Sequence, residues 1–503
     1  MNSFLNEMTN DANYKSTENG GVALKSTRSA VLDMFALCGA YRSRSEDDCI
    51  LMFKNALEEN AELALKCLFY LADCRGGQGE RRFFRVCYKW LATKHPELAR
   101  KNLELIPTYR RWDDVLYSCV GTPVEDDALA FIKKQLVLDT QCKTPSLLAK
   151  WLPSENASAK ETKIMGTIVR EYLGMTHKQY RKALSELRTR INIVEKLMSE
   201  NRWDEIEFDK IPSRAGLIYK NAFARRDMIA KKYEAFAKDE NTKVNAKTLY
   251  PYECVSQVVN KGRYYGGLSM SDVDRAMVEK YWNNLPDYFN GKQSNMLCVV
   301  DTSGSMVRSD AAAPINVAIS LGMYAAERAG GPFKNHYISF SRDPKLIKIE
   351  GVDFADKVYR IYRTNLCENT DLVKTFDMLL DIADRPDVKE EDISETIVVI
   401  SDMEIDSGSS QYWYNHRDGW TTKTAMTEMD KVRAKWAAHG HKLPRLVYWN
   451  VDARQNTILD AGPAVSFVSG MSPSIFESII TGKNGYQLMF EKLNSERYAA
   501  ITA

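Results

Sequence analysis

The sequence predicts an α-helical repeat region followed by an α/β domain with a mostly parallel sheet. Two observations lead to this fold class. Apolar residues recur at helix-face spacing, with short breaks, between residues 28 and 240. After about residue 290, short continuous apolar runs alternate with helical stretches, the pattern of strands buried on both faces of a parallel sheet. We therefore expect a flexible arm over 1–27, a helical region over 28–289 and an α/β domain over 290–503.

Length and composition agree with a multidomain globular protein. The chain has 503 residues, which is too long for one ordinary core, with 44% hydrophobic and 27% charged residues and a net charge of +2. We see no apolar stretch of signal-peptide or membrane-spanning length, so we expect a soluble, cytoplasmic protein without membrane contact. The ten cysteines are scattered without a CxxC pair, which favours reduced thiols.

The helical region is clearest in two segments. Apolar residues recur on one helix face over 61–71 and again over 83–91, and the breaks between helices fall at 76–79, at His95-Pro96 and at Ile106-Pro107. Short helices with short connections are typical of packed helix pairs. Charged helical segments continue over 160–240, and we place the junction with the α/β domain near 285–293, at LPDYFNGKQ.

In the α/β domain we expect strands over 296–300, 396–400 and 446–450. Helices are expected between them, over 312–328, 371–383 and 424–438. Ligands of such sheets bind where the strands end at their carboxyl edge. The residues that follow the strands are therefore candidates for a site.

Hard oxygen donors follow the first and the second of these strands. Asp301, Ser303 and Ser305 lie in DTSGSM, where Gly304 should ease a tight turn, and Asp402 follows the strand over 396–400. Between them Thr370 precedes a helix. Carboxylates and hydroxyls of this kind suit Mg²⁺ or Mn²⁺. Because the protein supplies few negative charges, the ion keeps an open coordination position for a carboxylate or phosphate oxygen of a partner. The alternative is a helix cap at 301–305. Glu404 and Asp406, which follow Asp402, either support the metal ligands from behind or are simply exposed, and we expect them to be exposed.

The motifs DTSGSM, NTD and SDME resemble the metal-ion-dependent adhesion site (MIDAS) of von Willebrand factor A domains. The resemblance covers about 200 residues and implies a Rossmann-like α/β fold. It also implies that Asp301, Ser303, Ser305, Thr370 and Asp402 hold the ion.

A helical region before such a domain is similar to the layout of the Ro autoantigen class, in which a TROVE module of HEAT-like repeats can close into a ring. A closer resemblance is to the DUF2828 family, through DCRGGQGERRFFR (73–85), YRRWDDVL (109–116), KWLPSENAS (150–158), YRKALSELR (180–188) and DKIPSRAG (209–216). The resemblance to the Ro class implies binding of small structured RNA or single-stranded RNA ends, as part of a ribonucleoprotein.

Cationic residues of the helical region form the expected RNA surface. They are Arg75, Arg81, Arg82, Arg85, Lys150, Lys160, Lys163, Arg181 and Lys182. Backbone amides of the glycine-rich turn at 76–79 and the guanidinium groups suit phosphate, and Tyr180 and Trp151 offer rings for base stacking. The alternative for single arginines is structural, with Arg81 and Arg82 paired to Asp113 and Asp114.

The sequence does not favour an enzyme. It has no P-loop, no dinucleotide fingerprint after a strand and no recognisable catalytic triad pattern, so we expect no nucleotide cofactor. His439 and His441 are expected to be a solvated pair rather than a zinc site. We predict a non-enzymatic RNA-binding protein. The competing hypothesis is a protein-interaction adaptor that grips an acidic partner residue through the metal, and a weaker third one is metal-dependent hydrolysis.

Overall fold

The structure is a computed structural model, and it describes residues 13–259, 268–308, 310–340, 343–364, 371–406, 427–460, 462 and 464–503. The chain forms two compact units. The helical unit comprises residues 46–248 and 494–503, and the α/β unit comprises residues 1–45 and 249–493. Both predicted fold types are confirmed.

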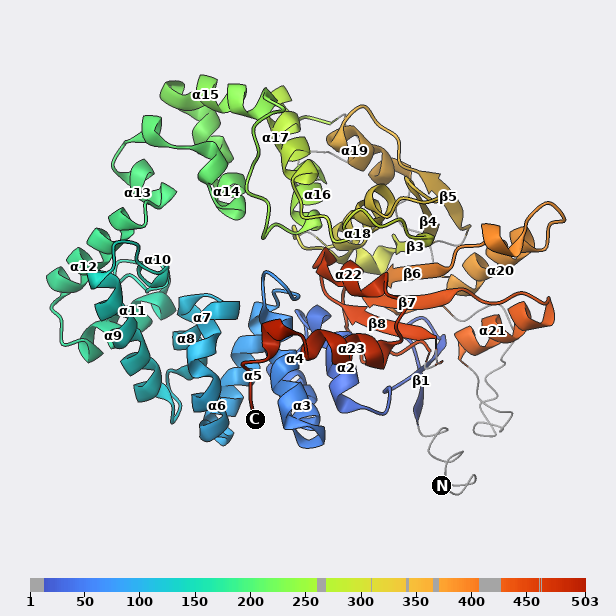
Figure 1. The fold of residues 1–503 in the computed structure, drawn as a ribbon, viewed down its shortest axis with the longest axis horizontal. Helices are drawn as coiled ribbons and strands as arrows, with labels where there is room; N and C mark the ends of the chain where they lie inside the picture. Colours follow the sequence, from blue (N-terminus) through green and yellow to red (C-terminus); the bar gives the residue numbers. More distant parts are fainter. Residues whose placement is uncertain are drawn as a thin grey trace. The chain divides into compact units, whose positions relative to one another are not determined.

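The helical unit consists of short helices that follow one another closely along the chain (Figure 1). They are α3 (Glu46–Glu59), α4 (Ala61–Ala72), α5 (Arg81–Lys94), α6 (Pro96–Asn102), α7 (Ile106–Tyr109), α8 (Trp112–Cys119), α9 (Glu125–Gln141), α10 (Leu148–Trp151), α11 (Lys160–Tyr172), α12 (His177–Arg190), α13 (Val194–Ser199), α14 (Ser213–Arg225) and α15 (Asp227–Lys238). The apolar residues of 61–71 and 83–91 lie in α4 and α5, as the sequence predicts. Capping side chains mark helix ends in this unit. The Asn60 side chain, for example, accepts from the amide of Leu63 at 2.9 Å and caps the start of α4.

The last residues of the chain belong to the helical unit rather than to the α/β unit. The Arg497 guanidinium forms an ion pair with the fully buried Asp73, and the Tyr109 hydroxyl donates to the Arg497 carbonyl at 2.5 Å. Asn102, also buried, donates to the Thr502 carbonyl at 2.8 Å. The α/β domain expected over 290–503 therefore extends ten residues too far, because residues 494–503 belong to the helical unit and satisfy its buried Asp73 and Asn102.

The α/β unit contains a six-stranded sheet with the order β5-β4-β3-β6-β7-β8. Its strands are β3 (Met296–Asp301), β4 (His336–Phe340), β5 (Lys345–Lys348), β6 (Thr396–Ser401), β7 (Arg445–Asn450) and β8 (Val465–Ser469). All neighbours are parallel except β4 and β5, so the antiparallel strand lies at an edge. The three predicted strands, β3, β6 and β7, are adjacent and almost completely buried.

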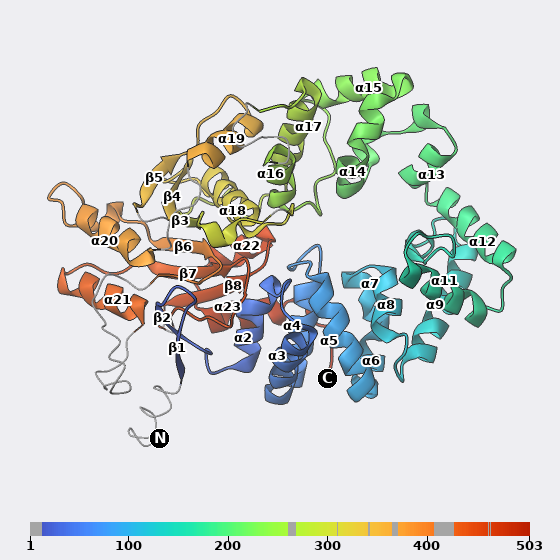
Figure 2. The same ribbon diagram turned by 180° about the vertical axis from the view of Figure 1, so that it is seen from behind.

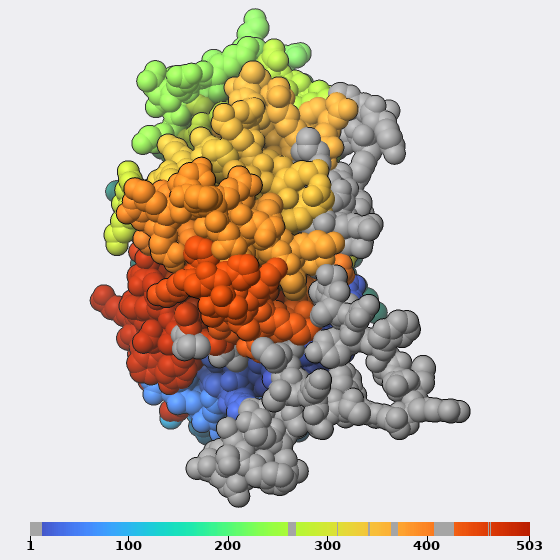
Figure 3. All heavy atoms as spheres, turned by 90° about the vertical axis from the view of Figure 1, so that its right-hand side faces the viewer, coloured from blue at the N-terminus to red at the C-terminus, as the bar shows by residue number. Residues whose placement is uncertain are grey.

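Helices pack around this sheet. They are α2 (Ala30–Leu37), α16 (Pro251–Val259), α17 (Asp272–Asn283), α18 (Pro314–Arg328), α19 (Phe354–Thr364), α20 (Leu372–Ala383), α21 (Glu428–Ala438), α22 (Phe476–Ile479) and α23 (Gly485–Leu493). α18 packs tightly on β3, since a Cβ on Gly322 would come within 2.4 Å of a Val300 methyl group. The atoms of α20 (orange) and α21 (red-orange) adjoin on the surface in Figure 3. Lys435 of α21 pairs with Asp377 of α20 at 2.8 Å.

The boundary expected near residue 290 is not the boundary between the compact units. α16 and α17 precede that position but pack with the α/β unit. The indole of Trp282, on α17, stacks on Phe354 with 4.4 Å between ring centroids and donates to Glu327 at 2.7 Å. The Tyr324 hydroxyl donates to the Pro286 carbonyl at 2.5 Å. These contacts join α17 and the loop after it to the α/β unit, and the boundary between the compact units lies at residues 248–249.

The predicted arm over 1–27 is structured over the residues that the structure describes. β1 (Tyr14–Ser16) and β2 (Val22–Leu24) pair antiparallel, and a bridge joins Leu24 to Ile458 beyond β7 (Figure 2). The buried Thr17 hydroxyl donates to the Ile405 carbonyl at 2.6 Å. The polar composition of this segment suggested flexibility, but its polar groups have partners in the α/β unit.

Candidate metal centre and cationic surface

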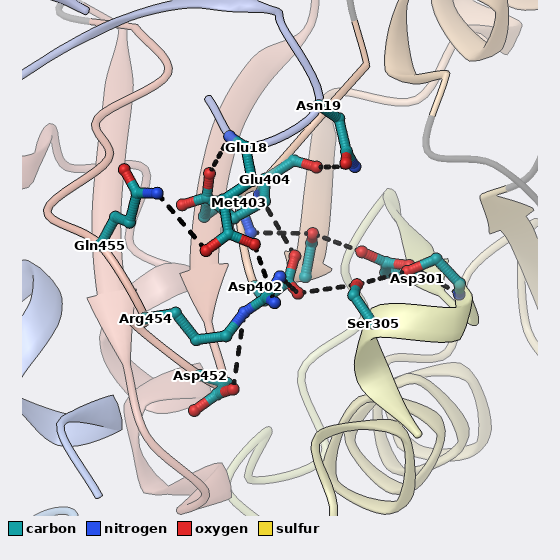
Figure 4. Close-up of polar contacts among 12 residues, drawn as sticks. Glu18, Asn19, Asp301, Ser305, Asp402, Met403, Glu404, Asp452, Arg454 and Gln455 are labelled. Atoms are coloured by element: carbon teal, nitrogen blue, oxygen red, sulfur yellow. Dashed lines mark hydrogen bonds and ion pairs between the residues drawn. The ribbon is translucent and has the colours of Figure 1, made fainter. Parts of the chain in front are cut away.

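The loops after β3 and β6 bring four of the predicted donors together (Figure 4). The Oγ atoms of Ser303 and Ser305 lie 3.0 Å apart, and Ser305 Oγ lies 2.9 Å from Asp402 Oδ2. Asp301 Oδ1 accepts from the Ser303 amide at 2.9 Å. Neighbouring parallel strands end at the same sheet edge, so residues separated by about 100 positions meet there. Thr370 lies outside the described residues.

The backbone at the site departs from one expectation. Gly304 is not in the left-handed region, and a Cβ there would meet nothing within 4 Å, so this turn does not require glycine. Met403, directly after Asp402, instead has φ +66°, a conformation that side chains disfavour. Its amide donates to Ser401 Oγ at 3.0 Å, and Ser401 Oγ donates to Asp301 Oδ2 at 2.5 Å. Strain at Met403 thus accompanies a hydrogen-bond chain that fixes Asp301.

Two buried carboxylates dominate the electrostatics of this edge. Asp301 is fully buried and Asp402 is 1% exposed. Burial, together with the charge of Asp402, raises the pKa of the Asp301 carboxyl well above its usual range. A divalent cation between these groups would offset both the desolvation and the mutual repulsion.

Arg454 supplies a cation at this site that the sequence analysis missed. Its Nη2 lies 2.7 Å from Asp402 Oδ2, its Nη1 lies 2.8 Å from a Glu18 carboxylate oxygen, and its Nε lies 4.0 Å from Asp452. Asp452 also pairs with Arg308. Arg454 lies in the loop after β7, and this strand was predicted. Applying the carboxyl-edge rule to that loop would have found it.

Glu404 is fully buried, and the expectation that it is exposed is wrong. One carboxylate oxygen accepts from Thr457 Oγ1 at 2.7 Å, and the other accepts from the Glu18 amide at 2.7 Å. Burial is the main cause that raises the pKa of the Glu404 carboxyl. Both partners lie far from Glu404 in the sequence. Through its hydrogen bond with the Glu18 amide, Glu404 holds the N-terminal segment next to the predicted metal site. Asp406 is partly exposed.

The donor set fits a hard divalent cation. Asp301, Ser303, Ser305 and Asp402 offer carboxylate and hydroxyl oxygens, which Mg²⁺ and Mn²⁺ prefer. Among the described residues, no group of three or more histidine, cysteine, aspartate or glutamate side chains is suited to hold a metal. A site here would therefore depend on the two serine hydroxyls.

The glycine-rich turn does not offer its amides to phosphate. The amides of Gln78, Gly79 and Glu80 donate to backbone carbonyls at 3.2, 3.0 and 2.7 Å. The Glu80 carboxylate itself accepts from the first amides of α5, those of Arg82 and Phe83. This helix start therefore carries its own anion, and the amides of Gln78 and Gly79 are already bonded, which speaks against a phosphate at this end of the turn.

Arg81 and Arg85 of α5 share two buried aspartates of α8 with Arg110 and Arg111, which directly precede α8. Asp114 accepts from Arg81 at 3.0 Å, from Arg85 at 2.5 Å and from Arg110 at 3.1 Å. Asp113 binds Arg81, Arg85 and Arg111. The structural pairing considered for Arg81 is thus present. Four guanidinium groups nevertheless face two carboxylates, which leaves two positive charges in excess.

The other predicted RNA-binding residues are spread over several elements. Arg75, Lys160, Lys163, Arg181 and Lys182 are exposed, whereas Lys150 is partly buried with its Nζ 3.7 Å from Glu195. Tyr180 is buried and donates to the Pro153 carbonyl at 2.9 Å, so it is not a platform for bases. The Arg111 guanidinium lies 3.9 Å from the ring centroid of Trp151 and occupies one face.

The histidine pair is bound to acidic side chains. Asp384 accepts from His439 at 2.7 Å and from His441 at 3.1 Å, and Glu390 also contacts His441 at 3.1 Å. Hydrogen bonding to Glu390 is the largest of the effects that raise the pKa of His441.

Comparison with protein families separates the chain into two parts. A family model described as a domain of unknown function, DUF2828, matches residues 17–118 and 158–292. These two segments are similar to the DUF2828 family. A second model, a domain of unknown function named DUF7788, matches residues 295–497. The DUF2828 segments therefore end near the predicted junction, although the compact units divide elsewhere.

Two further proteins are similar to this chain. The uncharacterized protein L728 of Acanthamoeba polyphaga mimivirus is 27% identical, with 94% of this chain and 85% of that protein covered. The crystal structure of the Deinococcus radiodurans RO (RSR) protein is 13% identical, with a TM-score of 0.45 over 94% of this chain and 100% of that chain. No described helix is long and apolar enough to cross a membrane.

Proposed function

We propose that this chain is a non-enzymatic RNA-binding protein whose α/β unit holds a divalent cation. The RNA part of the proposal rests on the unequal charge of the two compact units. The helical unit contains 37 lysine and arginine residues against 31 aspartate and glutamate residues, whereas the whole chain carries only +2. The helical unit is thus basic and the α/β unit acidic, and a polyanion would be attracted to the former.

The exposed cations of α11 and α12 extend the basic character. Lys160, Lys163, Arg181 and Lys182 are exposed in this pair of helices, where solvent allows phosphate contacts. Contacts of this kind bind RNA with little dependence on its sequence. The guanidinium excess at Asp113 and Asp114 would add contacts with fixed geometry.

The metal part of the proposal rests on the convergence of Asp301, Ser303, Ser305 and Asp402. A bound Mg²⁺ or Mn²⁺ would supply an open coordination position for an anionic oxygen. This same feature favours the second candidate function, an adaptor that grips an acidic residue of a protein partner without RNA.

RNA binding is tested with the full chain and a fluorescent single-stranded RNA. We expect binding that weakens steeply between low and moderate salt, because phosphate contacts release counterions. Replacing Lys160, Lys163, Arg181 and Lys182 with glutamine should weaken binding and flatten its salt dependence. In a matched control, four lysines of the α/β unit are replaced with glutamine, and RNA binding should not change. No salt-dependent binding would refute the RNA proposal, and Mg²⁺-dependent binding of an acidic peptide by the same preparation would favour the adaptor.

A further inference from the structure

A cavity of about 590 Å³, open to the surface, lies in the helical unit, and none of its lining residues belongs to the predicted metal site. Its walls come from α3, α5, α8 and α11, and α5 contributes most of them. A volume of this size is typical of pockets that hold a small ligand. Arg81, Arg82 and Arg85 of the lining belong to the motif DCRGGQGERRFFR, whereas the rest of the lining comes from the remainder of α5 and from three other helices.

One side of the cavity is cationic. Arg81, Arg85 and Lys89 follow one another at intervals of four residues, so they form one stripe along α5, and Arg82 lines the cavity as well. Arg81 and Arg85 are held by Asp113 and Asp114, which fixes their guanidinium groups before any ligand arrives. A preorganised guanidinium beside a mobile ammonium is a good receptor for a phosphate group.

The other side of the cavity is apolar and aromatic. Trp90 packs edge-on against Phe53, with 6.0 Å between ring centroids, and is still partly exposed to the cavity. Tyr117 lies beneath the Arg85 guanidinium, 3.9 Å from its ring centroid, and its hydroxyl lies 3.4 Å from Thr162. A flat heteroaromatic ring would find dispersion contacts on Trp90.

Two carboxylates complete the lining. Glu46, at the start of α3, and Glu161, in the first turn of α11, both face the cavity. Carboxylates accept hydrogen bonds from hydroxyl and amino groups but repel phosphate. The ligand that matches all three features therefore has one anionic end, a flat ring and hydrogen-bond donors between or beside them.

We propose that this cavity binds one nucleoside monophosphate unit. Its phosphate lies against Arg81, Arg82 and Lys89, and its base lies against Trp90. The unit is either a free mononucleotide or one nucleotide of a longer strand, because both present the same groups. This proposal does not depend on RNA binding by the exposed cations of α11 and α12.

Calorimetric titration of the full chain with AMP tests the proposal. We expect AMP to bind more tightly than adenosine or ribose 5-phosphate by about tenfold each, because each of these lacks one of the two main contacts. Lys89→Gln should weaken AMP binding about tenfold, whereas Lys94→Gln, on the same helix but outside the cavity, should not change it. Trp90→Leu should weaken AMP but not ribose 5-phosphate.

Other outcomes separate the two sources and refute the site. If AMP displaces a bound RNA oligonucleotide, the cavity takes one nucleotide of the strand. If AMP binds without displacing RNA, or with no RNA binding at all, the ligand is the free mononucleotide. Absence of AMP binding at millimolar concentration, or equal affinities in Lys89→Gln and Lys94→Gln, would overturn the proposal whatever the RNA result.

Discussion

Asp114 offers the strongest test of how the helical unit is held together. It is fully buried and accepts from three guanidinium groups. Burial alone would raise the pKa of the Asp114 carboxyl, but Arg110, Arg81 and Arg85 lower it to about 2. A depression from 3.8 corresponds to about 2.5 kcal/mol of stability in the charged form. Asp114→Asn should therefore lower the free energy of unfolding by about 2 to 3 kcal/mol, as measured in urea at pH 7.

The pH dependence of this loss follows from the sign of the shift. Because the folded pKa is depressed, the contribution is complete above the unfolded pKa near 4 and disappears as the pH falls toward 2. The difference between wild type and Asp114→Asn should shrink over that window. Asp126→Asn, an exposed aspartate of α9, is the control and should change little. If Asp114→Asn is as stable as Asp126→Asn at pH 7, the shared-carboxylate account is refuted.

Three further predictions concern the α/β unit. Thr17→Val removes a buried hydroxyl that donates at 2.6 Å, so thermal or urea unfolding should show a loss of about 1 to 3 kcal/mol; an unchanged stability would mean that the N-terminal segment is dispensable. Arg454→Met leaves the buried Asp402 without its guanidinium partner, so the melting temperature should fall in the absence of Mg²⁺ and recover when Mg²⁺ is added. A fall that Mg²⁺ does not reduce would contradict the idea that Arg454 and the metal ion both neutralise Asp402. Hydrogen bonding to Glu390, with a further contribution from Asp384, raises the pKa of His441, so NMR titration should give a value above the usual one. Glu390→Gln should lower that value, and an unchanged pKa would contradict the assignment. The associated stability is present at low pH and is lost as the pH rises through the raised pKa.

The strands that could be predicted are those whose burial is visible in their own residues. β3, β6 and β7 are continuous apolar runs, and the sequence places them correctly. β8 was missed because serines interrupt it at two buried positions. Ser466 donates to the Lys483 carbonyl at 2.6 Å, and Ser469 donates to the Phe35 carbonyl at 3.2 Å. A serine in a buried strand is satisfied by distant partners, which periodicity does not reveal.

The same limit applies to the site. The donors Asp301, Ser303, Ser305 and Asp402 follow predicted strands, so the rule that strands end at one sheet edge brings them together. Glu404 was expected to be exposed because a carboxylate is rarely buried without partners. Its partners, Glu18 and Thr457, lie at opposite ends of the chain, and only the folded structure shows them.

The central claim, that the sheet edge at Asp301 holds a divalent cation, is tested most directly by thermal unfolding after chelation. Adding Mg²⁺ to the chelated wild type should raise the melting temperature in a concentration-dependent way, because the ion binds the folded state. Asp301→Ala should abolish that rise, whereas Asp406→Ala, beyond the donor set, should keep it. An identical melting temperature of the wild type with and without Mg²⁺ or Mn²⁺ would contradict the claim.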